Sequence, residues 1–264
     1  METNNPKTPQ ELEVKLTIIH SNPDLFADKI SKLDKIGRYK LKLPELKQIH
    51  DTYFDTAEET FRRSRMAFRL RIENDQHFFT VKGKTKVQQW GGVERIEIES
   101  PWSIKAFQKT LMQLEQYGII LQVKDELLKD DNPMESMDNI GFFIIQDRHT
   151  SRLIRQIESG RNIVAELAID KVDYQVKDRQ LIHYEIEIEA KNSKGSKEIQ
   201  EIQRTLQSTY GDSLRLSVFS KLMLGMVLKE LPYNPKFFDL QKPLSNLTPT
   251  AYEWIEERLK AIHE

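Results

Sequence analysis

Strict alternation of charged and apolar residues near the start of the chain constrains the fold more than any other feature. Residues 11–16 read Glu-Leu-Glu-Val-Lys-Leu. Because successive side chains of a β-strand point to opposite faces, Glu11, Glu13 and Lys15 share one face. Two carboxylates two residues apart on a strand can bind one hard divalent cation. A half-exposed antiparallel strand with a solvated charged face is the alternative.

The same alternation recurs in later segments, which predicts a sheet rather than one isolated strand. The charged faces of these segments carry Arg69 and Arg71, then Thr80, Lys82 and Lys84, then Arg95, Glu97 and Glu99, and finally Glu185, Glu187 and Glu189. The connections over 83–92 and 171–180 are too short for helical crossovers. Roughly eight strands with helices between groups of them therefore favour an α+β fold, either an antiparallel sheet or a barrel decorated by helices.

Helical spacing of apolar residues predicts the elements that cover the apolar face of this sheet. The first helix is predicted to begin at Asn22-Pro23-Asp24 and to continue past Ile36 until Gly37 ends it. Further helices are predicted over 101–118, 196–210, 217–229 and 249–262, with a short one within 122–139.

Composition excludes several classes of protein. The 264 residues carry a net charge of −1, from 40 Lys and Arg against 41 Asp and Glu, so no global field attracts nucleic acid or an anionic membrane. With no cysteine, disulfides and thiolate metal sites are excluded, and a metal must bind oxygen or imidazole ligands. No apolar run approaches the roughly 18 residues that span a bilayer. Because residues 1–10 are polar, a cytoplasmic protein is expected.

The charged face of the sheet has two interpretations. It either meets open water, with opposite charges paired across strands, or it lines a wet lumen inside a closed sheet. Eight strands can close around a small ligand, but buried charges then require a ligand of matching chemistry. Metal-bound polyphosphate matches both signs, since carboxylates bind the cation and Arg and Lys bind phosphate oxygens. The sequence contains neither a Gly-x-x-x-x-Gly-Lys phosphate loop nor a Gly-x-Ser-x-Gly elbow.

Taken in order, these segments resemble the CYTH, or triphosphate tunnel metalloenzyme, superfamily. The resemblance runs from about Glu11 to Lys221 and covers Glu-x-Glu-x-Lys at 11–15, Asp-Thr-Tyr-Phe-Asp-Thr at 51–56, the Arg69/Arg71, Lys82/Lys84 and Arg95/Glu97 pairs, Glu-x-Glu-x-Glu at 185–189, and Ser220-Lys221. The long segment 101–146 and the tail after Leu231 depart from the family pattern.

The resemblance implies a closed eight-stranded antiparallel β-barrel, or tunnel, that binds a triphosphate with Mg²⁺ or Mn²⁺. The metal ligands that it implies are Glu11, Glu13, Glu97, Glu99, Asp170, Glu185 and Glu187. The implied phosphate-binding residues are Lys15, Arg69, Arg71, Lys82, Lys84, Arg95, Arg148, Arg152 and Lys221. Glu11, Glu13 and Lys15 are the residues expected to be catalytic.

The resemblance also implies a division into a tunnel domain over 1–230 and a helical extension over 231–264. The helix of this extension is expected to pack on the outside of the barrel, although it could also cap the tunnel or support a homodimer. Hydrolysis of an inorganic or organic triphosphate is the leading functional hypothesis. Cyclisation of ATP, as in class IV adenylate cyclases, and polyphosphate binding without turnover are the alternatives.

Overall fold

The chain divides into two compact units. The structure, a computed structural model, describes residues 10–177, 179–191, 195–239 and 245–263, so the polar stretch 1–9 lies outside the described residues. Unit 1 comprises residues 1–11, 50–86 and 94–147, and unit 2 comprises residues 12–49, 87–93 and 148–264. In the described part of the chain, no helix combines the length and apolar character needed to cross a membrane.

The strands form one sheet that closes on itself through its hydrogen bonds. Strands β1 (Gln10–Ile18), β7 (Val93–Pro101), β6 (Gln76–Val87), β5 (Met66–Glu73), β4 (Glu45–Asp55), β8 (Phe143–Ser159), β9 (Asn162–Val176) and β10 (Arg179–Ala190) are paired in that order, and β10 pairs again with β1. This closed eight-stranded antiparallel β-barrel, with helices inserted between its strands, confirms the predicted α+β class. Strand β11 (Leu214–Ser217) adds to β1, and β13 (Ser245–Leu247) pairs with β10 and with β12 (Phe238–Asp239).

The helix predicted to reach Ile36 is shorter than expected. Helix α1 (Pro23–Ser31) begins where predicted, capped by the Asn22 side chain, but it ends at Ser31. The next residues form β2 (Lys35–Ile36), which pairs with β3 (Tyr39–Leu41). Gly37 has φ +57°, a conformation that glycine adopts without steric cost, and it turns the chain between the two strands.

The prediction of a helix over 217–229 is also wrong about where the helix begins. Residues 214–217 form strand β11, and helix α6 (Lys221–Leu228) begins only after Ser220, whose hydroxyl oxygen accepts a hydrogen bond from the Met223 amide at 3.2 Å. The other helices lie near their predicted ranges: α3 (Ile104–Glu115), α4 (Pro133–Asn139), α5 (Ser196–Tyr210) and α7 (Pro249–His263), with α2 (Thr60–Arg63) as an additional single turn.

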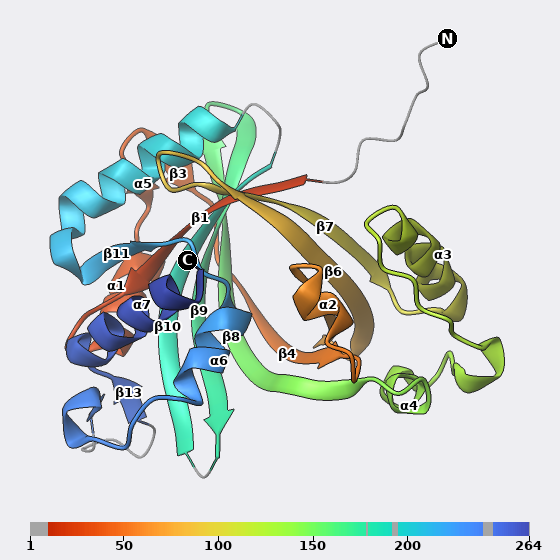
Figure 1. The fold of residues 1–264 in the computed structure, drawn as a ribbon. Coiled ribbons are helices and arrows are strands. Elements are labelled where there is room, and N and C mark those ends of the chain that lie inside the picture. The colour runs from red at the N-terminus through yellow and green to blue at the C-terminus, as the bar shows by residue number, and fades with distance from the viewer. Residues whose placement is uncertain (1–9, 178, 192–194, 240–244, 264) are drawn as a thin grey trace. The chain divides into compact units, whose positions relative to one another are not determined.

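Aromatic packing forms the core of unit 1. Helix α3 lies against the sheet in Figure 1, and its Phe107 contacts Phe68 and Phe79 of β5 and β6, each with ring centroids 5.8 Å apart. All three side chains are fully buried. Burial of one such ring contributes about 1.5–3 kcal/mol, so these contacts fix one face of β5 and β6 and leave the other face for charged residues.

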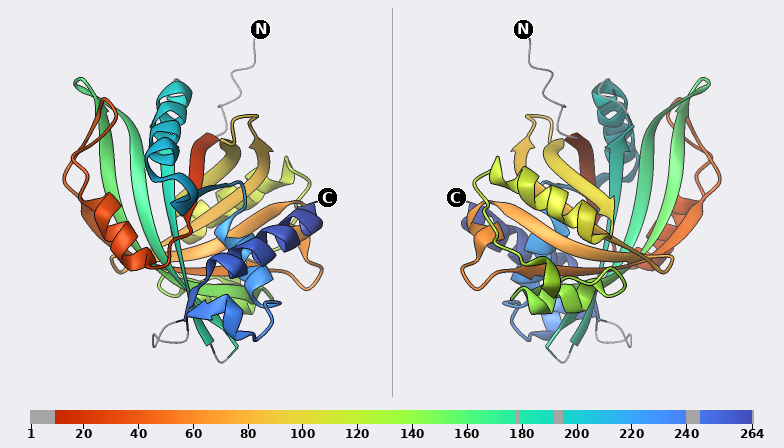
Figure 2. Two further views of the ribbon diagram at one scale, coloured as in Figure 1. Left: turned by 90° about the vertical axis from the view of Figure 1, so that its left-hand side faces the viewer. Right: turned by 90° about the vertical axis from the view of Figure 1, so that its right-hand side faces the viewer.

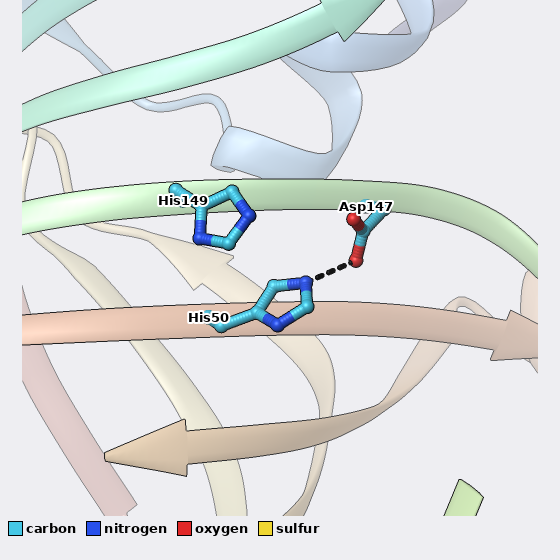
Figure 3. Close-up of side chains that lie close together, drawn as sticks. All are labelled: His50, Asp147 and His149. Atoms are coloured by element: carbon cyan, nitrogen blue, oxygen red, sulfur yellow. Dashed lines mark hydrogen bonds and ion pairs between the residues drawn. The ribbon is translucent and has the colours of Figure 1, made fainter. Parts of the chain in front are cut away.

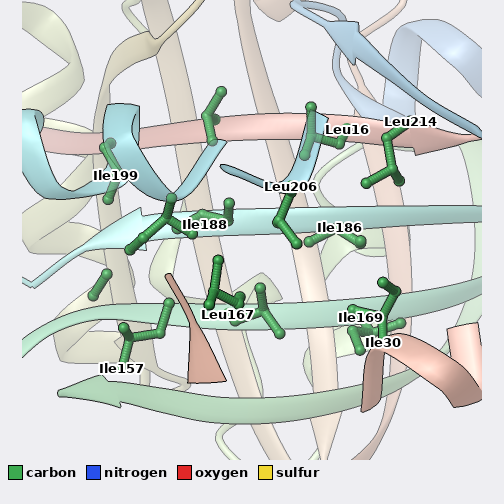
Figure 4. Close-up of a cluster of buried hydrophobic side chains, with 14 of the residues drawn as sticks. Leu16, Ile30, Ile157, Leu167, Ile169, Ile186, Ile188, Ile199, Leu206 and Leu214 are labelled. Carbon is green, nitrogen blue, oxygen red and sulfur yellow. The ribbon is translucent and has the colours of Figure 1, made fainter. Parts of the chain in front are cut away.

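Helices α1 and α5 cover the apolar face of unit 2. Figure 4 shows Ile199 and Leu206 of α5 in one cluster with Leu16 of β1 and Ile186 and Ile188 of β10, and all five are buried. The apolar face predicted from the alternation is therefore confirmed in both β1 and β10. Their charged residues must point to the opposite face of the same strands.

The carboxyl-terminal residues pack on unit 2. Helices α6 and α7 lie side by side in the two views of Figure 2 and contribute to one apolar cluster with β9 and β10. Tyr252, Ile255 and Leu259, which recur at helical spacing along α7, are buried there. The division into a domain over 1–230 and an extension over 231–264 remains a prediction.

Candidate active site

A carboxylate shared by two arginines lies at the centre of the charged face of unit 1. Asp51 of β4 accepts two hydrogen bonds from Arg71, from Nε at 2.7 Å and from Nη2 at 3.1 Å. Arg69, two residues away on β5, donates from Nη1 to the same carboxylate at 3.3 Å. Asp51 and Arg69 are buried. One acid thus holds both guanidinium groups.

Thr80 connects Arg69 to the carboxylates of β7. Its hydroxyl accepts from Arg69 Nε at 3.1 Å and donates to Glu99 at 2.8 Å. Arg69 Nη2 also lies 3.4 Å from Glu99 and 3.8 Å from Glu97. Burial alone would lower the pKa of Arg69, but Asp51 and these glutamates raise it. Burial would likewise raise the pKa of Glu99, but the nearby arginines lower it. Both groups are therefore charged at neutral pH.

Lys82 and Arg95 bind the remaining acids of unit 1. Lys82 Nζ lies 2.9 Å from Glu97 and 3.3 Å from Glu11, and Arg95 Nε lies 2.7 Å from Glu11. Burial, partly opposed by Lys82 and reinforced by the neighbouring Glu11, raises the pKa of Glu97 to about 7. We call this set the arginine cluster: Glu11, Asp51, Arg69, Arg71, Thr80, Lys82, Arg95, Glu97 and Glu99.

Lys84 does not join the arginine cluster, contrary to the alternation that placed it beside Lys82. Its backbone has φ +49°, a left-handed conformation that interrupts the alternation of β6. The Lys84 ammonium lies 5.0 Å from the ring centroid of Tyr117, which packs against the apolar core of unit 1.

A second set of charged residues occupies unit 2, where neighbouring strands bring acids and bases into register. Arg152 of β8 lies opposite Asp170 of β9, and Asp170 lies opposite Glu185 of β10. Arg152 donates to both carboxylate oxygens of Asp170, at 2.8 and 2.6 Å, and also contacts Glu187. Asp170 and Glu185 are buried, so their charges need partners.

Lys221 supplies the central positive charge of this set. Its Nζ lies 2.9 Å from Asp170 and 2.7 Å from Glu187, and it also forms an ion pair with Glu185. Burial would raise the pKa of Glu185, but Lys221 and a hydrogen bond from His183 hold it at about 2. Lys221 likewise keeps the pKa of Glu187 low despite burial, and the acids in turn raise the pKa of Lys221.

Strand β1 adds Glu13 and Lys15 to unit 2. Lys15 lies opposite Glu187 in the β1–β10 ladder, and its Nζ is 3.2 Å from Glu13 and 3.2 Å from the carbonyl oxygen of Phe219. Both charged side chains are almost completely buried. We call this set the carboxylate cluster: Glu13, Lys15, Arg152, Asp170, Glu185, Glu187 and Lys221.

Two neighbours of the carboxylate cluster were not predicted from the sequence. His183 Nε2 lies 2.9 Å from Glu185, and its Nδ1 lies 3.0 Å from the hydroxyl of Tyr252 in α7. Because His183 lies two residues before Glu185 on β10, the alternation along this strand was the signal that could have placed it on the charged face. Tyr252 had no such signal, since its place on α7 predicted only an apolar contact.

His50 of β4 and Arg148 of β8 are two further polar residues of the sheet. His50 Nε2 forms a hydrogen bond to Asp147 at 2.7 Å, and Figure 3 shows this contact, but both side chains are substantially exposed. Arg148 is buried on β8 opposite Tyr174, and its phosphate-binding role remains a prediction.

The carboxylate cluster fits a divalent cation. Asp170, Glu185 and Glu187 each offer an oxygen atom within 4.8 Å of the others. Carboxylate oxygens are the ligands that Mg²⁺ and Mn²⁺ prefer. The Lys221 ammonium at the centre of these three acids shows that the arrangement favours a positive charge there.

A closed antiparallel sheet that buries ion-paired acids and bases defines the class of protein to which this chain belongs. The family model described as the CYTH domain matches residues 9–216, which is most of the chain. The protein therefore belongs to the CYTH family. None of the curated proteins compared with the sequence matches it.

Solved structures support the same fold. HpAC1 from Hippeastrum, for which a dominant triphosphatase activity is described, has a TM-score of 0.55 and 20% identity, over 84% of this chain and 98% of that one. An adenylate cyclase candidate from Bacillus halodurans has a TM-score of 0.46 and 17% identity, over 81% and 96% of the two chains. The RNA triphosphatase domain of a mimivirus capping enzyme has a TM-score of 0.43 and 11% identity, over 77% and 89%. At 20% identity, the similarity to HpAC1 establishes the fold alone.

Proposed function

We propose that the protein hydrolyses a triphosphate in a reaction that depends on a divalent metal ion. The observation that carries this proposal is the carboxylate cluster, in which three acids of β9 and β10 surround Lys221. Its acids match a hard cation and its bases match phosphate oxygens, so a metal-bound triphosphate satisfies both. Family membership and the triphosphatase activity described for HpAC1 support the same reaction.

The bases of both clusters are proposed to bind and orient the phosphates. Arg69 and Arg71 present rigid guanidinium forks, which suit bidentate contacts to phosphate oxygens. Lys15, Lys82 and Lys221 provide compact charges. The remaining members of the phosphate-binding set predicted from the sequence are Lys84, Arg95, Arg148 and Arg152. As water attacks the terminal phosphorus and the anhydride bond breaks, these cations stabilise the negative charge that develops on the departing diphosphate.

The acids are proposed to hold the metal ions. Asp170, Glu185 and Glu187 form one ligand set, and Glu11 and Glu13 with Glu97 or Glu99 form the other. A bound Mg²⁺ or Mn²⁺ would neutralise phosphate charge and make hydroxide accessible near neutral pH.

Cyclisation of ATP and binding without turnover are distinguished from hydrolysis by their products. Hydrolysis of inorganic triphosphate releases phosphate and pyrophosphate, whereas cyclisation of ATP releases cyclic AMP and pyrophosphate. The number of buried acids argues against simple binding, because a polyphosphate by itself requires mainly cations.

The decisive experiment is a phosphate-release panel over inorganic triphosphate, thiamine triphosphate and ATP, each with Mg²⁺ and with Mn²⁺. We expect release from at least one substrate, and loss of that activity in excess chelator with recovery when the metal is restored. Undiminished turnover in chelator would exclude the metal role. Tight triphosphate binding without phosphate release would identify a binding module instead.

A further inference from the structure

A cavity of about 430 Å³ in unit 2 has no role in the proposed chemistry of phosphates and metals. It is bounded by β11, the residues that follow it, α6 and α7, and we call it the tail pocket. Its walls are largely apolar and include Leu216, Leu224, Ile255 and Leu259. Arg215 and Glu256, which pair at 2.9 Å, lie among its polar lining residues. Most of these residues lie after residue 216, outside the part matched by the family model.

The tail pocket is continuous with the carboxylate cluster. Glu185 and His183 both line it, and Glu185 forms an ion pair with Lys221. Ser220, which also lines the pocket, caps the helix that begins with Lys221. A molecule in the pocket is therefore in contact with side chains that adjoin the proposed phosphate and metal site.

Two hydroxyl groups give the apolar walls a specific polar contact. Ser217 Oγ accepts a hydrogen bond from the Phe219 amide at 3.4 Å, and Ser220 Oγ accepts one from the Met223 amide at 3.2 Å. Since a serine hydroxyl has one hydrogen to donate, each can donate to an acceptor atom of a ligand. The ring nitrogens and carbonyl oxygens of a heteroaromatic group are such acceptors.

We propose that the tail pocket binds the organic group of an organic triphosphate, a flat heteroaromatic ring system whose triphosphate extends to the carboxylate cluster. This inference rests on the proposed function and specifies its substrate. Apolar walls with a few fixed polar groups, in a volume within about 300–1,000 Å³, are typical of sites for small organic ligands. Inorganic triphosphate has no group that can use these walls, because it is charged along its whole length.

The test fills the tail pocket without changing the charged clusters. Val218 is a half-buried lining residue, and Val218→Trp places an indole in the cavity. We expect this variant to raise KM about tenfold or more for thiamine triphosphate or ATP, while its kinetics on inorganic triphosphate stay at the wild-type level. The comparison of thiamine triphosphate with ATP shows which ring system fits. Val218→Phe repeats the test with a smaller side chain if the Trp variant does not fold.

A matched control lies elsewhere in unit 2. A second cavity of about 430 Å³ is lined by Leu43, whose side chain is 90% exposed, so Leu43→Trp introduces the same side chain at a surface position outside the tail pocket. It should change the kinetics of none of the three substrates. Wild-type turnover of inorganic triphosphate alone, or organic turnover that Val218→Trp and Val218→Phe leave unchanged, overturns the tail-pocket proposal but not the hydrolase proposal. An absence of turnover on every triphosphate overturns the hydrolase proposal and this one with it.

Discussion

The two charged clusters are built on opposite principles. In the arginine cluster a single acid, Asp51, lies between two arginines, Arg69 and Arg71. In the carboxylate cluster Lys221 lies among three acids, two of which also pair with Arg152. In each cluster a central charged group thus holds several groups of the opposite charge close together, although those groups repel one another. Asp51 thus brings together two cations suited to phosphate, and Lys221 brings together three anions suited to a metal ion.

The two clusters also differ in the pKa values of Glu97 and Glu185. Burial and the nearby Glu11 raise the pKa of Glu97 to about 7, so part of the protein carries a proton there at neutral pH. Although burial opposes ionisation of Glu185, Lys221 and His183 hold its pKa at about 2. Glu185 is therefore ionised over the physiological range, whereas Glu97 is only partly ionised at neutral pH.

The largest effect expected from this comparison is on stability. Asp51→Ala leaves the buried Arg69 and its neighbour Arg71 without their shared acid. Removal of one partner from a buried ion pair costs about 3–5 kcal/mol. The free energy of unfolding, measured with urea, should fall by about that amount.

An exposed pair in the same unit provides the control for Asp51. Arg62 and Glu59 lie 2.8 Å apart, but both side chains are largely exposed. Arg62→Ala should therefore change the unfolding free energy by less than about 1 kcal/mol. Equal losses in the two variants would show that Asp51 does not organise the arginine cluster.

The next effect is on turnover, and it tests the carboxylate cluster. Glu187→Gln keeps the shape of the side chain but removes one negative charge from the proposed metal site. Loss of groups that only support metal ligands already costs about 10–100-fold in affinity or activity. Loss of a metal ligand itself should cost more. The kcat/KM of Glu187→Gln should therefore fall by at least about 100-fold, with part of the loss recovered at higher metal concentration.

Glu189 is the matched control for Glu187, because it lies two residues further along β10 on the same strand face. It pairs with Lys191 at 3.5 Å instead of with Lys221. Glu189→Gln should leave kcat/KM close to the wild-type value. If the two variants lose activity equally, the site is not confined to the carboxylate cluster.

The alternation of charged and apolar residues, together with the helical spacing of apolar residues, was sufficient to predict most of the fold. Charged and apolar residues that alternate along β1 and β10 identified both faces of these strands, and the apolar faces are buried as predicted. Helix α5 lies over the predicted residues. The prediction from periodicity was wrong where the chain makes a tight turn. Ile36 fits a helical stripe, but it belongs to the short hairpin that turns at Gly37.

The candidate site was less predictable than the fold, because it depends on contacts between distant segments. Alternation placed Lys84 beside Lys82, but a left-handed backbone at Lys84, which no residue pattern indicated, gives its ammonium a contact with Tyr117. Asp51 was recognised only as part of a strand motif, since nothing local shows that two arginines of another strand share it. Tyr252 lies 69 residues from its hydrogen-bond partner His183, beyond the reach of any local pattern.

The smallest effect expected comes from Tyr252, and it tests whether the tail helix α7 supports the carboxylate cluster. Glu185 is ionised and can only accept hydrogen bonds, so His183 must donate to it from Nε2. In the neutral ring, Nδ1 then accepts from the Tyr252 hydroxyl, whose pKa burial raises, so that it keeps its proton. These two hydrogen bonds fix the orientation of the Glu185 carboxylate.

Tyr252→Phe removes this hydroxyl and keeps the ring in its apolar contacts. The metal concentration for half-maximal activity should rise about tenfold, the lower range for partners that orient a metal ligand. Tyr184→Phe is the control, because it removes a buried hydroxyl that contacts Asp24 on the opposite face of β10. Both variants should lose similar stability, but only Tyr252→Phe should change the metal dependence. An identical metal dependence in the two variants would mean that α7 contributes packing alone.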